Sequence, residues 1–202
     1  MDVFEAMHTQ RAIRRYTSDP VSNEEIVKIM KATTHAPSGG NSQPWHFIVV
    51  RDPEQRRKLG DIYWGATKYA RENLGLHKET PTYLRSGYDF AQHIGEFPVH
   101  ILPFVETGTM DSFGRGSNIY MAIQNLLLAA RALGLGTCYT GNIRTVSEYE
   151  EAAKKVLDVP DGWHLAALIP LGHLGPGEHF GGARRKPLEE VISYERWGQH
   201  TP

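Results

Sequence analysis

The sequence predicts a fold that combines α-helices with a few short, buried β-strands. Helix starts are indicated by capping-box spacing, in which a Ser or Asp is followed three residues later by Glu. The pairs with this spacing are Asp2 and Glu5, Ser22 and Glu25, and Ser147 and Glu150. Buried strands are indicated by apolar runs rich in β-branched residues. These runs occupy residues 47–50, 98–105 and 163–171.

The expected helices can be placed from these starts and from the prolines and glycines that end them. They occupy about residues 2–10, 22–36, 52–74, 116–136 and 147–160. Pro53 suits the first turn of the third helix, and Pro37 stops the second. The strongest prediction is Gly116–Gly136, whose apolar residues extend beyond one helical stripe. Such a helix is buried on more than one side, and contact with a second subunit would satisfy this pattern.

The composition favours one domain that spans residues 1–202. The formal net charge is −1, so binding to nucleic acid through bulk electrostatics is not expected. The first ten residues lack a signal-peptide core, and no apolar run approaches the length of a membrane span. The single cysteine excludes an internal disulfide framework. We therefore expect a cytoplasmic protein that binds neither nucleic acid nor membrane.

The chain lacks the usual motifs for catalysis by its own side chains. Its ten histidines are scattered without an HExxH pair, and there is no CxxC motif, so no metal site is expected. No GxSxG elbow, Walker loop or GxGxxG fingerprint is present. Cys138 lies in an apolar stretch and is expected to be a buried structural thiol. No catalytic residue is therefore assigned.

The stretch Ala36–Phe47, APSGGNSQPWHF, combines stiff prolines, permissive glycines and polar side chains. Irregular backbone with polar side chains is where ligand contacts concentrate. On composition alone, a ligand-binding loop and a plain connection between a helix and a central strand explain it equally well.

Two basic clusters allow two explanations as well. The clusters are Arg11, Arg14 and Arg15 near the start of the chain, and Arg184, Arg185 and Lys186 near its end. Guanidinium groups this close repel one another unless they are solvated or share an anion, and their planar forks suit phosphate oxygens. A solvated face is the ordinary explanation of such a cluster, and a phosphate site is the alternative.

Two further segments have no settled place in this pattern. Residues 75–95 interrupt the helical pattern and are either a cover over a pocket or a surface excursion. The C-terminal tail is more apolar than a free terminus needs, so we expect it to dock on something. Its apolar residues are Leu188, Val191, Ile192, Tyr194 and Trp197.

The basic clusters, the polar loop and the glycine-rich turn after residue 133 together describe a site for a phosphorylated cofactor that brings its own chemistry. Four segments, in order, resemble the FMN-dependent nitroreductase family. They are RAIRRYTSDPV, APSGGNSQPWHFIVV, NLLLAARALGLGTCYTGN, and IPLGH followed by RRKPLEEVISYERW. The resemblance implies an α+β fold with a mixed β-sheet flanked by helices. It also implies an intertwined homodimer whose C-terminal tail crosses onto the partner.

The resemblance further implies an FMN site at each subunit interface. The phosphate and ribityl chain would be held by the segment of Arg11, Ala12 and Arg14, with Arg184 and Arg185 completing the clamp. The flavin ring would meet Tyr139, Thr140 and Gly141 of the same subunit, and Pro37, Ser38, Gly39 and Asn41 of the opposite subunit. Gln10 and Ala12 depart from the family's pattern, and each departure removes a phosphate or ribityl contact.

By resemblance, the activity would be an oxidoreductase reaction in two halves, in which NADH or NADPH gives electrons to bound FMN. A small acceptor, such as a nitroaromatic or a quinone, then takes them. One alternative is another flavin reaction on the same fold, such as dehalogenation, oxidative dehydrogenation or flavin fragmentation. A second is a flavin-binding protein without turnover, which the departures at Gln10 and Ala12 support. The sequence does not distinguish NADH from NADPH.

Overall fold

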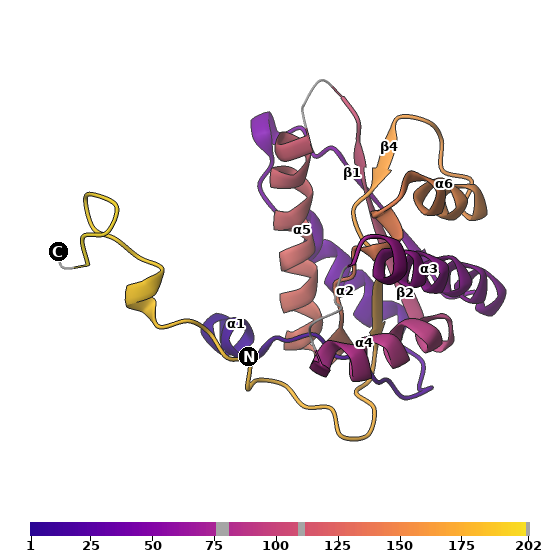
Figure 1. The fold of residues 1–202 in the computed structure, drawn as a ribbon, viewed down its shortest axis with the longest axis horizontal. Helices are drawn as coiled ribbons and strands as arrows, with labels where there is room; N and C mark the ends of the chain where they lie inside the picture. The colour runs from indigo at the N-terminus through magenta and orange to yellow at the C-terminus, as the bar shows by residue number, and fades with distance from the viewer. Residues whose placement is uncertain (76–80, 109–111, 201–202) are drawn as a thin grey trace.

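Helices cover both faces of a small β-sheet in the computed structural model, which describes residues 1–75, 81–108 and 112–200 (Figure 1). The helices are α1 Val3–Thr9, α2 Asn23–Thr34, α3 Pro53–Asn73, α4 Pro81–His93, α5 Ser112–Ala132 and α6 Ser147–Val156. The strands are β1 Trp45–Val50, β2 Val99–Glu106, β3 Gly136–Thr137, β4 Trp163–Leu165 and β5 Ile169–Gly172. This arrangement confirms the α+β fold class.

Strand β2 lies at the centre of the sheet. It pairs with β1, β4 and β5, and β3 pairs with β5, which gives the main order β1-β2-β5-β3. All of these ladders are antiparallel. The sequence predicted a mixed sheet. The parallel contact among the described residues is one isolated bridge, between Ala12 and Thr137 of β3. This bridge brings the segment that follows α1 to the edge of the sheet.

Two apolar cores lie on opposite faces of β2, because side chains alternate along a strand. Val99, Ile101 and Val105 join residues of α2 and α5 in one core. Leu102 and Phe104 join residues of α3, α4 and α6 in the other. Accordingly, α5 stands on one side of the strands in Figure 1, and α3, α4 and α6 stand on the other. None of the described helices combines the length and the apolar character that crossing a bilayer requires.

The start of α2 has the complete capping box that the sequence predicts. The N–H of Glu25 donates to Ser22 Oγ at 3.2 Å, and the N–H of Ser22 donates to Glu25 Oε2 at 2.9 Å. The prediction of a capping box at Ser147 and Glu150 is wrong, because α6 begins at Ser147 itself. The Glu150 carboxylate points to the sheet instead, where its Oε1 accepts from the N–H of Leu165 at 2.9 Å.

Two strand predictions need correction. β1 is an edge strand and not a central one, since among the described strands it pairs with β2 alone, and within it only Val50 is buried. The run 163–171 forms two strands, β4 and β5, where one was expected. The N–H of Ala166 still donates to the Pro103 carbonyl of β2, but the N–H of Leu168 donates to the Thr140 carbonyl outside β2, and this interrupts the ladder.

The described part of the segment 75–95 is mostly helical, so a surface excursion is the wrong description. α4 packs beside α3, and its residues Phe90 and Ala91 are buried in the same core. Gly87 and Phe90 also line a cavity, which is described below. The sequence did not predict this helix, because closely spaced aromatic residues and a glycine interrupt its helical pattern. Residues 76–80 of this segment lie outside the described part of the chain.

The C-terminal tail extends away from the rest of the chain, as the yellow end of the ribbon shows in Figure 1. Leu188, Val191, Ile192 and Trp197 are exposed along it, and Trp197 is completely exposed (100%). Burial of an apolar side chain of this size contributes about 1.5–3 kcal/mol of free energy relative to its exposure to water. The tail therefore carries apolar surface that this single chain leaves uncovered.

His100 on β2 is a buried histidine whose protonation opposes folding. Its Nε2 donates to the Ile94 carbonyl at 2.7 Å, and Nδ1 has no partner among the described residues. Burial lowers the pKa of His100 to about 4, although the hydrogen bond to Ile94 acts in the opposite direction. An unfolded histidine takes up its proton near pH 6.5. Neutral His100 therefore stabilises the fold above that pH, and the contribution is lost as the pH falls towards 4.

We expect wild-type protein to lose more stability between pH 7 and pH 4 than the variant His100→Gln, by up to about 3 kcal/mol. The difference follows because glutamine has no proton to take up in this range. Urea unfolding of both proteins across this pH range measures it. Parallel pH profiles for the two proteins would contradict the assignment.

Candidate functional site

The arginine segment between α1 and α2 is fixed against the sheet. The N–H of Ile13 donates to the Thr137 carbonyl at 2.9 Å, and the Tyr16 hydroxyl donates to the Ile13 carbonyl at 2.7 Å. Ile13 packs so closely on Gly136 that a Cβ there would lie 2.8 Å from Ile13 Cγ2. Glycine at this position permits the approach, and the fixed backbone places Arg14 next to the turn that follows β3.

Arg14 shares a cavity with the residues predicted to meet a flavin ring. The cavity has a volume of about 190 Å³. It is lined by Arg14, Tyr63, Gly87, Phe90, Cys138, Tyr139, Thr140, Gly141 and Asn142. The structure therefore brings together four of the predicted site residues from distant parts of the sequence. We call this space the Arg14 cavity.

The charge of the Arg14 cavity suits an anion. Among the described residues, no carboxylate lies within salt-bridge distance of the Arg14 guanidinium. Glu178 is an acid in this region, and its Oε1 accepts from the backbone N–H of Arg14 at 3.4 Å. Burial raises the pKa of the Cys138 thiol to about 11, with Arg14 acting in the opposite direction. The thiol is therefore protonated at neutral pH, which agrees with a structural role.

The Arg14 cavity fits part of a phosphorylated cofactor but not a whole one. The guanidinium of Arg14 suits a phosphate group. The rings of Tyr63 and Phe90 pack edge to face, with their centroids 6.3 Å apart, and form an apolar wall. Sites for small molecules usually enclose about 300–1,000 Å³. At about 190 Å³, this cavity needs further walls to enclose a mononucleotide.

Arg11 and the second basic cluster lie outside the Arg14 cavity. Arg11 Nη1 donates to the Gly181 carbonyl at 2.9 Å, which holds the start of the tail beside the arginine segment. Arg184 and Arg185 follow on the tail and are exposed. The single chain does not bring them to Arg14, so their place in a phosphate clamp stays a prediction.

The polar loop and α1 are held by different parts of α5. The N–H of Gly39 donates to Asn118 Oδ1 at 2.8 Å, whereas Arg131 Nε donates to Thr9 Oγ1 at 2.8 Å. Asn118 and Arg131 are 13 positions apart in the helix, which corresponds to about 20 Å at 1.5 Å per residue. None of the loop residues Pro37, Ser38, Gly39 and Asn41 lines the Arg14 cavity within one chain.

The loop presents polar groups to solvent in a defined conformation. Gly40 and Asn41 have φ values of 58° and 54°, in the left-handed region that glycine and asparagine tolerate. The N–H of Gln43 donates to Ser38 Oγ at 3.0 Å, which closes the turn. Asn41 and Pro37 are exposed.

Sequence reasoning missed several residues of the site. Asn118 is 3% exposed, yet it lies in the most apolar helix of the chain and holds Gly39. A polar residue among the apolar positions of a helix is a signal that could have identified it. Tyr63 and Phe90 carried no such signal, since aromatic residues at helical spacing also describe an ordinary core.

The fold and the Arg14 cavity define an α+β protein that places the arginine segment after α1 beside the turn that follows α5 and β3. The sequence model described as Nitroreductase family matches residues 8–173. The chain therefore belongs to the nitroreductase family.

Individual relatives extend this comparison. An Archaeoglobus fulgidus protein named as an NADH dehydrogenase/NAD(P)H nitroreductase is 28% identical, over 95% of this chain and 96% of that protein. The 5,6-dimethylbenzimidazole synthase of Rhodospirillum rubrum is 28% identical, over 81% of this chain and 77% of that enzyme. A Desulfovibrio desulfuricans protein named as a nitroreductase, solved in complex with FMN, is 30% identical, covers 98% of both chains and superposes with a TM-score of 0.71.

Proposed function

We propose that the protein is an FMN-dependent oxidoreductase that moves electrons from NADH or NADPH to a small acceptor, such as a quinone or a nitroaromatic compound. The observation that carries the proposal is the Arg14 cavity, which joins an arginine without a carboxylate partner to the turn at Tyr139–Gly141. The FMN complex of the 30% identical relative supports the choice of cofactor. The nitroreductase name of the Archaeoglobus relative supports the type of reaction.

The residues of the cavity would bind and orient the cofactor, and bound FMN would supply the hydride-transfer chemistry. Arg14 would hold the phosphate with charge-assisted hydrogen bonds. The backbone of Tyr139, Thr140 and Gly141 would face the edge of the ring. Tyr63 and Phe90 would exclude water from one side. The hydride step would require no acid or base from the chain's own side chains.

A homodimer would complete the site. None of the residues Pro37–Asn41 lines the Arg14 cavity within one chain, so a second subunit would bring them to the cofactor held by Arg14. Exposed apolar side chains on α1, on α5 and on the tail support such an interface. They include Val3, Phe4, Met7, Met121, Leu188, Val191 and Trp197. We propose that the tail crosses onto the partner and carries Arg184 and Arg185 with it.

The 5,6-dimethylbenzimidazole synthase relative supports a second candidate, in which the same flavin site serves another reaction. A third candidate is a flavin-binding protein without turnover. Steady consumption of NADH or NADPH with a simple quinone favours the first proposal over both.

The absorbance spectrum of purified protein, before and after anaerobic addition of NADH or NADPH, tests the proposal. We expect a yellow protein whose flavin bands bleach with one or both nicotinamides and return when a quinone is added. A protein that remains colourless after incubation with FMN would contradict the cofactor assignment. Bound flavin that neither nicotinamide reduces would contradict the oxidoreductase assignment.

A further inference from the structure

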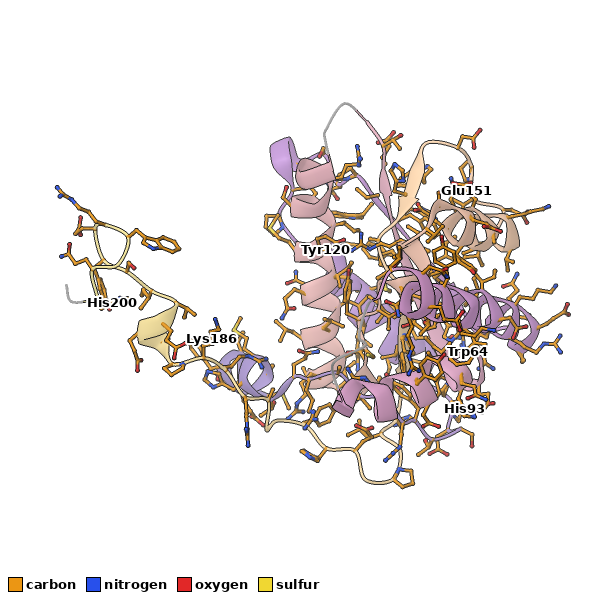
Figure 2. All side chains as sticks on the ribbon, in the orientation of Figure 1. Trp64, His93, Tyr120, Glu151, Lys186 and His200 are labelled. Carbon is orange, nitrogen blue, oxygen red and sulfur yellow. The ribbon has the colours of Figure 1, made fainter. Side chains whose placement is uncertain are left out.

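A second polar cavity lies beside the turn proposed to meet the flavin ring. It has a volume of about 160 Å³ and lies between the N-terminal half of α5, strand β4 and α6. Its polar lining consists of Arg115, Tyr120, Arg144, Glu150 and His164. Figure 2 labels Tyr120, which comes from α5, the helix on one side of the sheet. The proposed function assigns no role to these five residues. We call this space the Arg144 cavity.

Tyr120, which lines the Arg144 cavity, forms a partly exposed aromatic pair with Tyr139, which lines the Arg14 cavity. Their ring centroids lie 6.0 Å apart with the planes at 79°, and each residue is 38% exposed. Burial raises the pKa of Tyr120, and its hydrogen bond with Tyr139 acts in the same direction. The Tyr120 hydroxyl is therefore protonated at neutral pH. The pair offers aromatic faces together with hydroxyl donors to a planar ligand.

Arg144 connects this cavity to the proposed flavin segment. Its Nη2 lies 3.5 Å from the Tyr139 hydroxyl, and its Nε lies 3.4 Å from the position that a Cβ on Gly141 would occupy. Within the described ranges, no carboxylate comes within salt-bridge distance of this guanidinium. An arginine that forms no salt bridge with the described residues, next to Tyr139 and Gly141, is suited to recognising a carboxylate on a substrate.

Two guanidinium groups, one carboxylate and one histidine line the Arg144 cavity. Arg115 adds a second guanidinium, whose Nη1 donates to the Thr107 carbonyl at 3.3 Å. Glu150 is the opposing charge, but its Oε1 already accepts from the N–H of Leu165 at 2.9 Å and lies 3.2 Å from His164 Nδ1. Glu150 Oε1 is therefore held by the sheet, and the carboxylate lies beyond salt-bridge distance of Arg144, although its charge still acts on that guanidinium.

We propose that the electron acceptor is an aromatic compound with an anionic group, and that Arg144 binds this anion while Tyr120 and Tyr139 contact the aromatic ring. This inference rests on the proposed function, because it places the acceptor next to a flavin at Tyr139–Gly141. Arg144 is a specificity residue in this arrangement: it fixes which acceptor binds and takes no part in reduction of the cofactor.

Paired acceptors test the proposal in the FMN-loaded protein. 4-Nitrobenzoate and 4-nitrobenzamide have nearly the same shape and differ in charge. We expect Arg144→Gln to lower the ratio of kcat/KM for the benzoate over the benzamide by about 10- to 100-fold, mainly through KM, because a charge-assisted hydrogen bond is lost. Arg144→Lys should restore part of the ratio. Arg57→Gln, which removes an exposed arginine of α3, is the control and should leave the ratio unchanged.

Binding provides a readout that does not depend on turnover. Calorimetry with 4-nitrobenzoate and the oxidised, FMN-loaded protein should show an affinity that falls by a similar factor in Arg144→Gln and not in Arg57→Gln. An unchanged ratio and affinity in Arg144→Gln would overturn the proposal. An effect confined to NADPH, with NADH unaffected, would overturn it as well, because the anion would then belong to the electron donor.

The two proposals fail in different ways. A protein that binds FMN and is reduced by NADH or NADPH, but treats the two nitro compounds alike in wild type and Arg144→Gln, retains the proposed function and loses the acceptor class. A protein that binds no FMN loses both proposals.

Discussion

Replacement of Arg14 by alanine is expected to raise the dissociation constant for FMN by about 10- to 100-fold. The change removes the guanidinium of the Arg14 cavity and with it a charge-assisted contact to phosphate, worth about 1.5–3 kcal/mol. Titration of the apoprotein with FMN, followed by quenching of flavin fluorescence, measures the affinity directly. Riboflavin, which lacks the phosphate, should lose little affinity in the same variant.

Arg15 offers a matched control for this experiment. It is the next residue in the chain and is exposed, and it does not line the Arg14 cavity. Arg15→Ala should therefore bind FMN within about twofold of wild type, since exposed charges away from a site contribute little. Equal losses in the two variants, or an unchanged affinity in Arg14→Ala, would remove Arg14 from the phosphate site.

Gly60→Ala is expected to reduce the free energy of unfolding by about 1–3 kcal/mol. Alanine is the better helix former, so an open position in α3 would gain stability from this change. At residue 60, however, the added Cβ would lie 2.6 Å from Gly95 Cα and 2.8 Å from Gly95 N. Both are backbone atoms, so α3 and the turn at Gly95 must move apart. Urea unfolding measures the loss.

Gly65→Ala in the same helix is the control for crowding. Its Cβ would lie 3.0 Å from Tyr149 Cε1, at the edge of a side-chain ring that can rotate away. We expect a smaller loss than at residue 60. A larger loss at residue 65 would show that backbone contact with Gly95 is not what limits this part of the fold.

Local signals predicted most of the helices and the buried strand β2, although they placed the centre of the sheet at β1. Ser22 and Glu25 form the expected capping box, and residues 99–105 are buried as expected. The predictions fail where contacts between residues distant in the sequence determine the structure. Glu150 has capping-box spacing but pairs with the sheet. The run 163–171 divides because Leu168, in its middle, donates its N–H to Thr140 and not to β2.

For the candidate site, the sequence identified residue types but not their grouping. Arg14 and Tyr139–Gly141 carried a recognisable motif, and the structure places them in one cavity. Tyr63 and Phe90 join them only through the packing of α3 and α4, which no local pattern encodes. Arg144 was not singled out, since an arginine at the end of a short turn has no sequence signature. The loop at Ser38–Asn41 does not line the Arg14 cavity within one chain, which no local pattern in the sequence could show.

A mixed dimer tests the shared site most directly. One subunit carries Arg14→Ala, the other carries Asn41→Ala, and the two are separated from the homodimers by different affinity tags. If each FMN is held by Arg14 of one subunit and Asn41 of the other, one site contains both changes and the second contains neither. We therefore expect one FMN per mixed dimer at wild-type affinity, although both homodimeric variants bind weakly. If no site in the mixed dimer reaches wild-type affinity, the two residues act within one chain and the shared site is contradicted.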